Sequence, residues 1–261
     1  TDPLCVAVRS AAAAGITVVV AAGNFGLNAS NKEVHGQISA PGNDPSVITV
    51  GSVNLHDSVV RDDDTINGFG SRGPPRGSYL DGTGVRRVDN LLKPDLVAPG
   101  NRLVGAGSTL ANTLTWNLLG STFLSNLVSP LGIAANLNET QMMMSGTSIA
   151  APAVAGAVAL MLQANPGLTP PLVKLILQTT AQPLRNTNLL QQGAGALNID
   201  GAVRLAKVVR SDASTAIAAG TISTGTSLLT GSVTPSSTVG GTAFNWSRLH
   251  IVGGNHIVDG L

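Results

Sequence analysis

Residues Ser145-Gly-Thr-Ser-Ile-Ala-Ala-Pro152 run directly into Ala153-Val-Ala-Gly-Ala-Val-Ala-Leu-Met-Leu162. The small residues Gly146 and Thr147 indicate a turn, and the run that follows is apolar on every side, which predicts a helix buried inside a large domain. This run is shorter than the roughly 20 apolar residues that span a bilayer. We expect Ser148 at the start of the helix and Pro152 in its first turn, where a missing N–H costs nothing.

Ser148 is a candidate nucleophile. The first N–H groups of a helix lack internal partners and, with the positive end of the helix dipole, they favour negative charge. A hydroxyl at that point is well placed to attack a carbonyl carbon whose oxygen becomes negative. The alternative is that the Ser148 hydroxyl only caps the helix, which is the ordinary role of a serine before a helix.

The composition indicates that the chain can bury a substantial hydrophobic core. It has 261 residues, 43% of them hydrophobic and 11% charged, which suits one large α/β domain or one domain with an appendage. The net charge of +1 gives no reason to expect nucleic acid or an anionic membrane as a partner. The single cysteine, Cys5, excludes an internal disulfide and is expected to be a buried structural thiol.

Several segments predict α/β architecture. A helix is expected from Asp2-Pro3 to Ala14, where Gly15 stops it. The β-branched run Ile16–Ala22 lacks alternation, which predicts a central parallel strand covered on both faces, and Ser46–Val53 predicts a second buried strand. Two later helices are expected, one capped by Thr169 with Pro170 and Pro171 in its first turn and one opened by Asn198 that runs through Lys207.

The residues Gly146, Thr147, Ser148, Ala150 and Pro152 resemble Gly-Thr-Ser-x-Ala-x-Pro, the nucleophile motif of the subtilisin-like serine proteases, or subtilases. Further stretches resemble motifs of this family and follow in its order: Ala21-Ala-Gly-Asn24 with Gly26, Ala40 to Gly51, Phe69-Gly-Ser-Arg-Gly-Pro74 and Lys93-Pro-Asp-Leu-Val-Ala-Pro-Gly100. The resemblance covers about residues 1–209.

The resemblance implies a three-layer α/β fold, with a mostly parallel sheet and helices on both faces, that is incomplete at its N-terminus. It implies a serine endopeptidase that works through an acyl-enzyme on Ser148, while Asn24 donates its side-chain amide to the oxyanion. It also assigns part of the substrate pocket to Ala21, Ala22, Gly23, Phe25 and Thr147.

The family's catalytic Asp and His lie in an Asp-Ser/Thr-Gly motif and a His-Gly-Thr-His motif, and neither occurs here. Both would precede Thr1, so we expect the chain to begin inside a longer protein that supplies them. In subtilisin, a member of the family, loss of the base alone lowers turnover about a million-fold. The isolated chain is therefore expected to be inactive. The alternative is a catalytically inactive subtilase homologue that acts as a binding or scaffold module.

The sequence is also compared with the patterns of an α/β-hydrolase and of a calcium site. A lipase or esterase of the α/β-hydrolase type needs Gly-x-Ser-x-Gly, which does not surround Ser148. The acidic run Asp62–Asp64 could bind calcium, but its spacing fits no ligand loop, so a solvated loop is expected and no metal site is assigned. The proposed chemistry requires no cofactor. His35 is expected to be an exposed or capping residue.

The remaining segments are expected to surround the domain. A surface excursion is expected over Asn101–Gln141, with a partly helical stretch near Thr122–Val128. A core strand is expected at Met142–Met144, just before the nucleophile. Residues 210–261 form a Gly/Ser/Thr-rich linker with strand-like pieces, among them Phe244–Val252. Protein or peptide substrates, a monomeric state and an extracellular location are inferred from the family and from the low charge of this tail.

Overall fold

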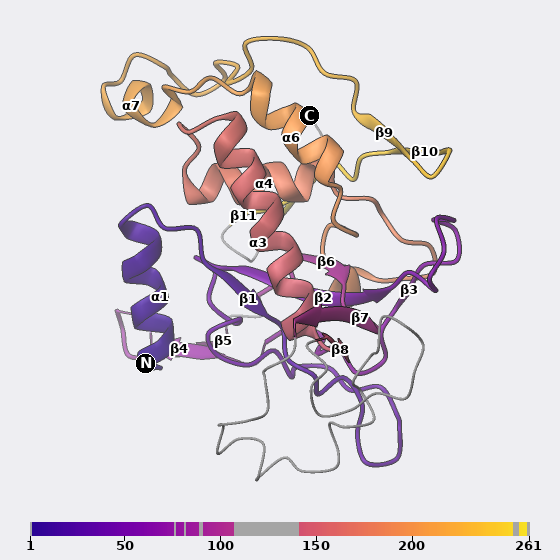
Figure 1. Cartoon of the computed structure of the whole chain (residues 1–261). Helices are drawn as coiled ribbons and strands as arrows, with labels where there is room; N and C mark the ends of the chain where they lie inside the picture. Colours follow the sequence, from indigo (N-terminus) through magenta and orange to yellow (C-terminus); the bar gives the residue numbers. More distant parts are fainter. Residues whose placement is uncertain are drawn as a thin grey trace.

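The computed structural model describes residues 2–75, 77–80, 82–88, 91–106, 141–252 and 256–259. Its central four-stranded sheet is built around β2 (Ile48–Asn54), which pairs in parallel with β1 (Val19–Ala21) and β6 (Leu96–Pro99). The end of β2 also pairs antiparallel with β3 (Thr65–Ile66). Helices lie over this sheet (Figure 1), which confirms the predicted α/β class.

The other elements are helices and two-stranded antiparallel ribbons. The helices are α1 (Pro3–Ala13), α3 (Thr147–Ala164), α4 (Pro170–Thr180), α5 (Leu189–Gln192), α6 (Ile199–Val208) and α7 (Ala213–Ala218). The ribbons are β4 (Ser78–Leu80) with β5 (Arg86–Val88), β7 (Leu103–Ala106) with β8 (Gln141–Met144), β9 (Ser236–Val239) with β10 (Thr242–Asn245), and β11 (Leu249–Val252) with β12 (His256–Asp259).

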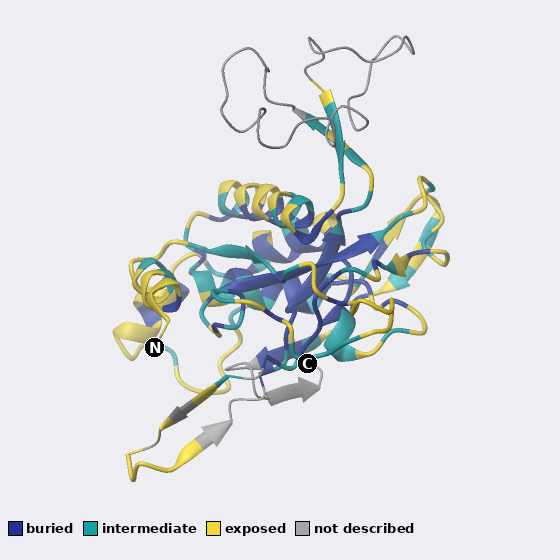
Figure 2. Ribbon diagram, turned by 90° about the horizontal axis from the view of Figure 1, so that it is seen from below, coloured by how far each residue is buried: buried dark blue, intermediate teal, exposed yellow. Residues whose placement is uncertain are grey.

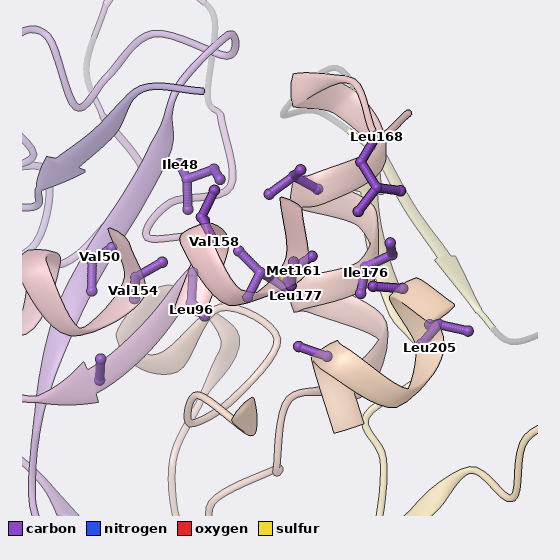
Figure 3. Packing of buried hydrophobic residues seen from close by; sticks show 14 of the residues in the cluster. Ile48, Val50, Leu96, Val154, Val158, Met161, Leu168, Ile176, Leu177 and Leu205 are labelled. Carbon is purple, nitrogen blue, oxygen red and sulfur yellow. The ribbon is translucent and has the colours of Figure 1, made fainter. Parts of the chain in front are cut away.

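The main hydrophobic core lies between the sheet and α3, and it continues to α4 and α6. Figure 3 shows its buried aliphatic side chains, which come from the sheet (Ile48, Val50, Leu96), from α3 (Val154, Val158, Met161), from α4 (Ile176, Leu177) and from α6 (Leu205). Burial of each such side chain is worth about 1.5–3 kcal/mol. One side of α3 therefore fixes the helix on the sheet.

The opposite side of α3 is exposed, so the predicted burial on every side is wrong. Five residues of this side are exposed, and 46% of the Leu160 surface is accessible: Pro152, Ala155, Gly156, Ala159 and Leu160. A uniformly apolar sequence has no periodicity that could show which face lacks a neighbour. By length and composition alone α3 could cross a membrane, but here its other face packs on the sheet.

Pro152 lies one turn later than predicted. The helix begins at Thr147, so Pro152 is its sixth residue and stands inside the helix. A proline there has no N–H to donate to the carbonyl four residues earlier, which belongs to Ser148. The helix consequently leaves that carbonyl without its usual partner.

Two strand predictions also need correction. Within the described residues β1 pairs only with β2, and Val19 and Val20 are half-buried, so β1 is an edge strand and not a central one. Met142–Met144 does form a strand, but it is half-buried and pairs with β7 outside the central sheet. Figure 2 shows this ribbon extending away from the buried core. Residues 107–140, which include the expected helix at 122–128, lie outside the described residues.

The predicted helix starts are largely confirmed. Asp2 caps α1 by accepting hydrogen bonds from the N–H groups of Leu4 and Cys5, and Asn198 caps α6. Thr169 precedes α4 as predicted, but its hydroxyl makes no capping hydrogen bond. The Cys5 thiol is buried, as predicted, and burial raises its pKa.

Part of the segment from residue 210 onward packs on the domain. The Trp246 indole is buried in the main core, and its Nε1–H donates to Ser237 Oγ at 3.0 Å. The Arg204 guanidinium lies 5.3 Å from the centre of the indole ring. The backbone N–H groups of Ser247 and Arg248 donate to carbonyls at the end of α4 and just after it. The helix α7 was not predicted, and the boundary at residue 209 stays a prediction.

A fully buried carboxylate joins the sheet to α4. Asp95 accepts hydrogen bonds from Lys93 Nζ at 2.7 Å, from the Thr49 N–H at 2.7 Å and from Gln178 Nε2 at 3.2 Å. Lys174 Nζ forms an ion pair with it at 2.9 Å. Burial lowers the pKa of Lys93 to about 8. Burial alone would raise the pKa of Asp95, but Lys174 and Lys93 hold it below its usual value, so Asp95 is ionised at neutral pH.

We predict that Asp95→Asn lowers the free energy of unfolding by about 3–5 kcal/mol at neutral pH, because two ammonium groups would lose their buried counter-charge. The measurement is urea unfolding followed by circular dichroism. Asp62→Asn is the control, because the Asp62–Arg185 pair is exposed and 3.6 Å long and is worth at most about 1 kcal/mol. Equal losses for the two variants would contradict a stabilising role of the buried network.

Candidate active site

Ser148 is the second residue of α3, and its side chain is exposed. The cap residue is Gly146, and no side chain makes a capping hydrogen bond at this end. A purely capping role of Ser148 is therefore not what the structure shows. Within the described residues, neither the Ser148 hydroxyl nor its N–H has a hydrogen-bond partner, while the N–H groups of Ile149 and Ala150 donate to the Gly146 carbonyl. Ser148 thus presents a free hydroxyl and a free N–H.

The Asn24 side chain is held beside this turn by Thr147. Asn24 Oδ1 accepts hydrogen bonds from the Thr147 N–H at 3.0 Å and from Thr147 Oγ1 at 2.9 Å. Both partners are donors, so this arrangement fixes which end of the amide is oxygen. The amide nitrogen lies next to Gly146, where a β-carbon would be 3.3 Å from it, and the φ of Gly146 is 151°. A glycine at this position therefore leaves space for the Asn24 amide.

The loop that carries Asn24 is fixed from two sides. Thr147 Oγ1 accepts the Gly23 N–H at 3.2 Å. From the other side, Ser71 Oγ accepts the Phe25 N–H at 3.1 Å, and the Ser71 N–H donates to the Gly23 carbonyl at 2.8 Å. Arg72 donates to the Gly26 carbonyl at 3.1 Å. The segment 69–74 therefore supports the candidate site. Its motif predicts that it lies near the site but does not indicate these hydrogen bonds.

The segment 93–100 supports the turn before the nucleophile. The Gly146 N–H donates to the Gly100 carbonyl at 2.8 Å. A β-carbon on Gly100 would lie 2.4 Å from Ser52 Oγ and 2.7 Å from the Gly146 carbonyl oxygen. Only a glycine permits this approach. The end of β6 thus sets the position of the turn from which α3 and Ser148 start.

The five residues predicted to line the substrate pocket have different environments. Phe25 is exposed, with 61% of its surface accessible, and Ala21 and Gly23 are half-buried. The side chains of Ala22 and Thr147 are fully buried, so neither can contact a substrate through its side chain. Thr147 instead positions Asn24. The predicted substrate contact accordingly rests on Phe25, Ala21 and Gly23.

The histidines whose side chains are described have partners away from Ser148. His35 Nδ1 lies 3.0 Å from the Gly73 carbonyl oxygen, His56 Nε2 lies 2.8 Å from Thr65 Oγ1, and His250 Nε2 lies 2.7 Å from Thr179 Oγ1. His35 is half-buried and not exposed, and among the described residues no hydrogen bond joins it to Ser148. The described residues therefore include a candidate nucleophile and two candidate oxyanion donors, but no described histidine side chain is hydrogen-bonded to Ser148.

The acidic run near β3 is only partly a solvated loop. Asp62 and Asp63 are exposed, as predicted, but Asp64 is buried and lies 3.3 Å from Arg61 Nη1. Both Asp64 oxygens lack hydrogen-bond partners, and burial raises the pKa of this carboxyl group. Over the described ranges, no group of three or more His, Cys, Asp or Glu side chains could hold a metal ion.

Comparisons with known proteins agree with this geometry. The family model described as "Subtilase family" matches residues 1–201. Serine protease AprX of Bacillus subtilis is 34% identical over 202 residues, which cover 77% of this chain and 38% of that protein. Subtilisin-like protease SBT2.3 of Arabidopsis thaliana is 37% identical over 122 residues, which cover 44% of this chain and 12% of that protein. The chain thus spans well under half the length of these relatives.

One solved structure supports the fold. The patellamide maturation protease PatA superimposes with a TM-score of 0.50 at 23% identity, and the match covers 79% of this chain and 57% of that one. At this level of identity the likeness concerns the fold alone.

We predict that Thr147→Val lowers the free energy of unfolding by about 1–3 kcal/mol, because the Gly23 N–H and Asn24 Oδ1 would each lose a partner next to a buried side chain. Thr147→Ser is the matched variant: it keeps the hydroxyl and loses only a methyl group, worth about 1 kcal/mol. Thermal and urea unfolding measure both. A Thr147→Ser variant that is less stable than Thr147→Val would show that packing of the methyl group matters more than the two hydrogen bonds.

Proposed function

The chain belongs to the subtilase family, and we propose that it supplies the nucleophile and the oxyanion donors of a serine endopeptidase that cleaves peptide bonds through an acyl-enzyme. The observation that carries this proposal is the convergence of three groups at the start of α3. These are the free Ser148 hydroxyl, the free Ser148 N–H and the Asn24 amide, which Thr147 holds in a fixed orientation. Donors that are fixed before the reaction stabilise developing negative charge without reorganisation.

In the proposed reaction, Ser148 Oγ attacks the carbonyl carbon of the scissile peptide bond and its proton passes to a base. The carbonyl oxygen becomes an oxyanion that accepts hydrogen bonds from the Ser148 N–H and Asn24 Nδ2. The C–N bond then breaks, the base returns the proton to the departing amine, and the acyl group remains on Ser148. Water hydrolyses this ester by the same steps and restores the hydroxyl. None of these steps needs a metal or an organic cofactor.

We place the base and its orienting carboxylate on a segment outside this chain. Support comes from the exposed apolar face of α3, formed by Pro152, Ala155, Gly156, Ala159 and Leu160, which begins one turn from Ser148. A segment that covered this face would bury apolar surface and could carry an imidazole to the Ser148 hydroxyl. The small residues of the face would let its backbone approach closely.

The substrates are proposed to be proteins or peptides, with Phe25 at the accessible edge of the binding site. An extracellular location is supported by the family and by the Ser/Thr-rich, weakly charged composition of residues 210–261. The net charge of +1 gives no support for nucleic-acid binding. The monomeric state also remains part of the proposal.

The first test is covalent labelling of the protein expressed from its complete reading frame. A fluorophosphonate probe should react with one serine, and peptide mass spectrometry should find the label on Ser148. Ser148→Ala should abolish labelling and peptide hydrolysis, whereas Ser145→Ala should retain both. Labelling at a different residue would overturn the assignment, and failure to label a folded protein would favour an inactive homologue that serves as a binding module.

A second test concerns the oxyanion donor. Asn24→Ala in the same protein should lower kcat about 10²–10³-fold with a much smaller change in KM, because the amide acts on the transition state more than on the bound substrate. Asn245→Ala is the control, because that asparagine is exposed on β10 and takes no part in the site. If kcat falls by less than tenfold in Asn24→Ala, this amide is not the oxyanion donor.

A further inference from the structure

A large cavity lies on a part of the domain that the proposed reaction does not use. Its volume is about 740 Å³, and its walls come from α4, α6 and two stretches of the C-terminal segment. Cavities of roughly 300–1,000 Å³ are typical of small-molecule binding sites. Because Gly225, Thr226 and Ser227 of its wall are exposed, the cavity reaches the surface on that side.

Most of the wall is apolar. The side chains that dominate it are Leu172, Leu175, Ile176, Leu205, Val209 and Trp246. Protein interiors are normally packed to the density of organic crystals, and a void deprives its lining of dispersion contacts. An apolar ligand that enters such a cavity removes apolar surface from water, which is favourable. The lining therefore favours an aliphatic occupant.

The polar groups of the wall are mostly satisfied within the protein. Thr179 Oγ1 donates to the Leu175 carbonyl at 2.7 Å, so its oxygen accepts from His250 Nε2 at 2.7 Å. Burial lowers the pKa of His250, and the imidazole is therefore neutral near pH 7. The Trp246 Nε1–H is bonded to Ser237.

Arg248 is different, because it is the one cationic residue among the described residues of the wall and it is exposed. Its backbone N–H donates to the Thr179 carbonyl, but in the described part of the chain its guanidinium has neither an ion pair nor a hydrogen bond. An aliphatic interior is thus combined with an exposed arginine that has no side-chain partner among the described residues. The charge that complements it is a carboxylate, which arginine can bind through two parallel hydrogen bonds.

We propose that this cavity binds a long-chain aliphatic carboxylate, with the chain between α4, α6 and Trp246 and the carboxylate on Arg248. An apolar peptide fits the wall less well. Each residue of a peptide brings an N–H and a C=O that would lose water without finding partners here, and each unpaired group costs free energy. An acyl chain has no such groups. The inference is independent of the proteolytic function, since no residue of the cavity wall belongs to the candidate active site.

The first experiment is isothermal titration calorimetry of the 261-residue chain with octanoate, decanoate, dodecanoate and tetradecanoate below their micelle concentrations. Each added methylene should tighten binding about fourfold until the cavity is filled. In parallel, Trp116→Phe leaves Trp246 as the only tryptophan, and its fluorescence should change on binding. Absence of binding for every acid in the series would overturn the proposal, as would binding without dependence on chain length.

Two variants locate the ligand. Arg248→Gln should weaken dodecanoate binding roughly five- to tenfold while dodecanol binding stays unchanged. Arg102→Gln is a matched control: it is also an exposed arginine with positive φ, 53° against 54° for Arg248, and it should leave both affinities unchanged. Leu175→Trp should abolish binding of the acid by filling the cavity, with folding checked by the melting temperature.

Equal losses of dodecanoate binding in Arg248→Gln and Arg102→Gln would reduce the role of Arg248 to general surface charge and overturn the proposed carboxylate contact. Binding of dodecanoate that survives in a folded Leu175→Trp protein would place the ligand elsewhere. Tighter binding of an apolar peptide with a free C-terminus than of dodecanoate would replace the proposed ligand class with a peptide.

Discussion

The two hydrogen bonds from Thr147 to Asn24 Oδ1 join the end of β1 to the start of α3 across 123 residues of sequence. These bonds fix the orientation of the Asn24 amide. The Thr147 hydroxyl also accepts the Gly23 N–H and so fixes the backbone beside Asn24. The other motif segments act on this junction, because Ser71 fixes the loop after β1 and Gly100 fixes the turn before α3. Residues that are dispersed along the chain thus make one rigid unit at the carboxyl end of parallel strands, where open α/β sheets bind ligands.

This unit needs a fixed sheet and a fixed helix beneath it. One face of α3 packs on β2 and β6, and the same core continues through Met161 to α4 and α6. The buried Asp95 then links β6 and α4 with its two lysines. A buried charge cluster of this kind adds little net stability, yet it is costly to break. It therefore restricts how α4 can sit against the sheet, and the C-terminal segment in turn packs on α4 through Trp246 and the residues after it.

Local signals made some of this structure predictable. Asp2 and Gly15 mark the ends of α1, the apolar run of β2 is buried on both faces, and Asn198 begins α6. The motif residues around Ser148 and Asn24 predicted that these two groups would meet. The exposure of a strand or helix face was not predictable where it depends on which other element packs there. The sequence of β1 does not show that it lies at the sheet edge, and the sequence of α3 does not show which of its faces is exposed. The burial of Asp64 and the packing of residues 236–252 also depend on long-range contacts that no local pattern specifies.

The exposed face of α3 and the lack of a base beside Ser148 among the described side chains are connected by one constraint. A serine hydroxyl reacts only when a base accepts its proton, and that base must reach Ser148 from a side that is not already filled. Asn24 and Thr147 occupy one side of the turn, and Gly100 closes another against Gly146. The side that continues into Pro152, Gly156 and Leu160 is exposed. In the proposed arrangement, a segment that brings an imidazole to Ser148 along this route would cover the apolar face, so the burial that stabilises its docking and the proton transfer that activates the serine would come from the same contact.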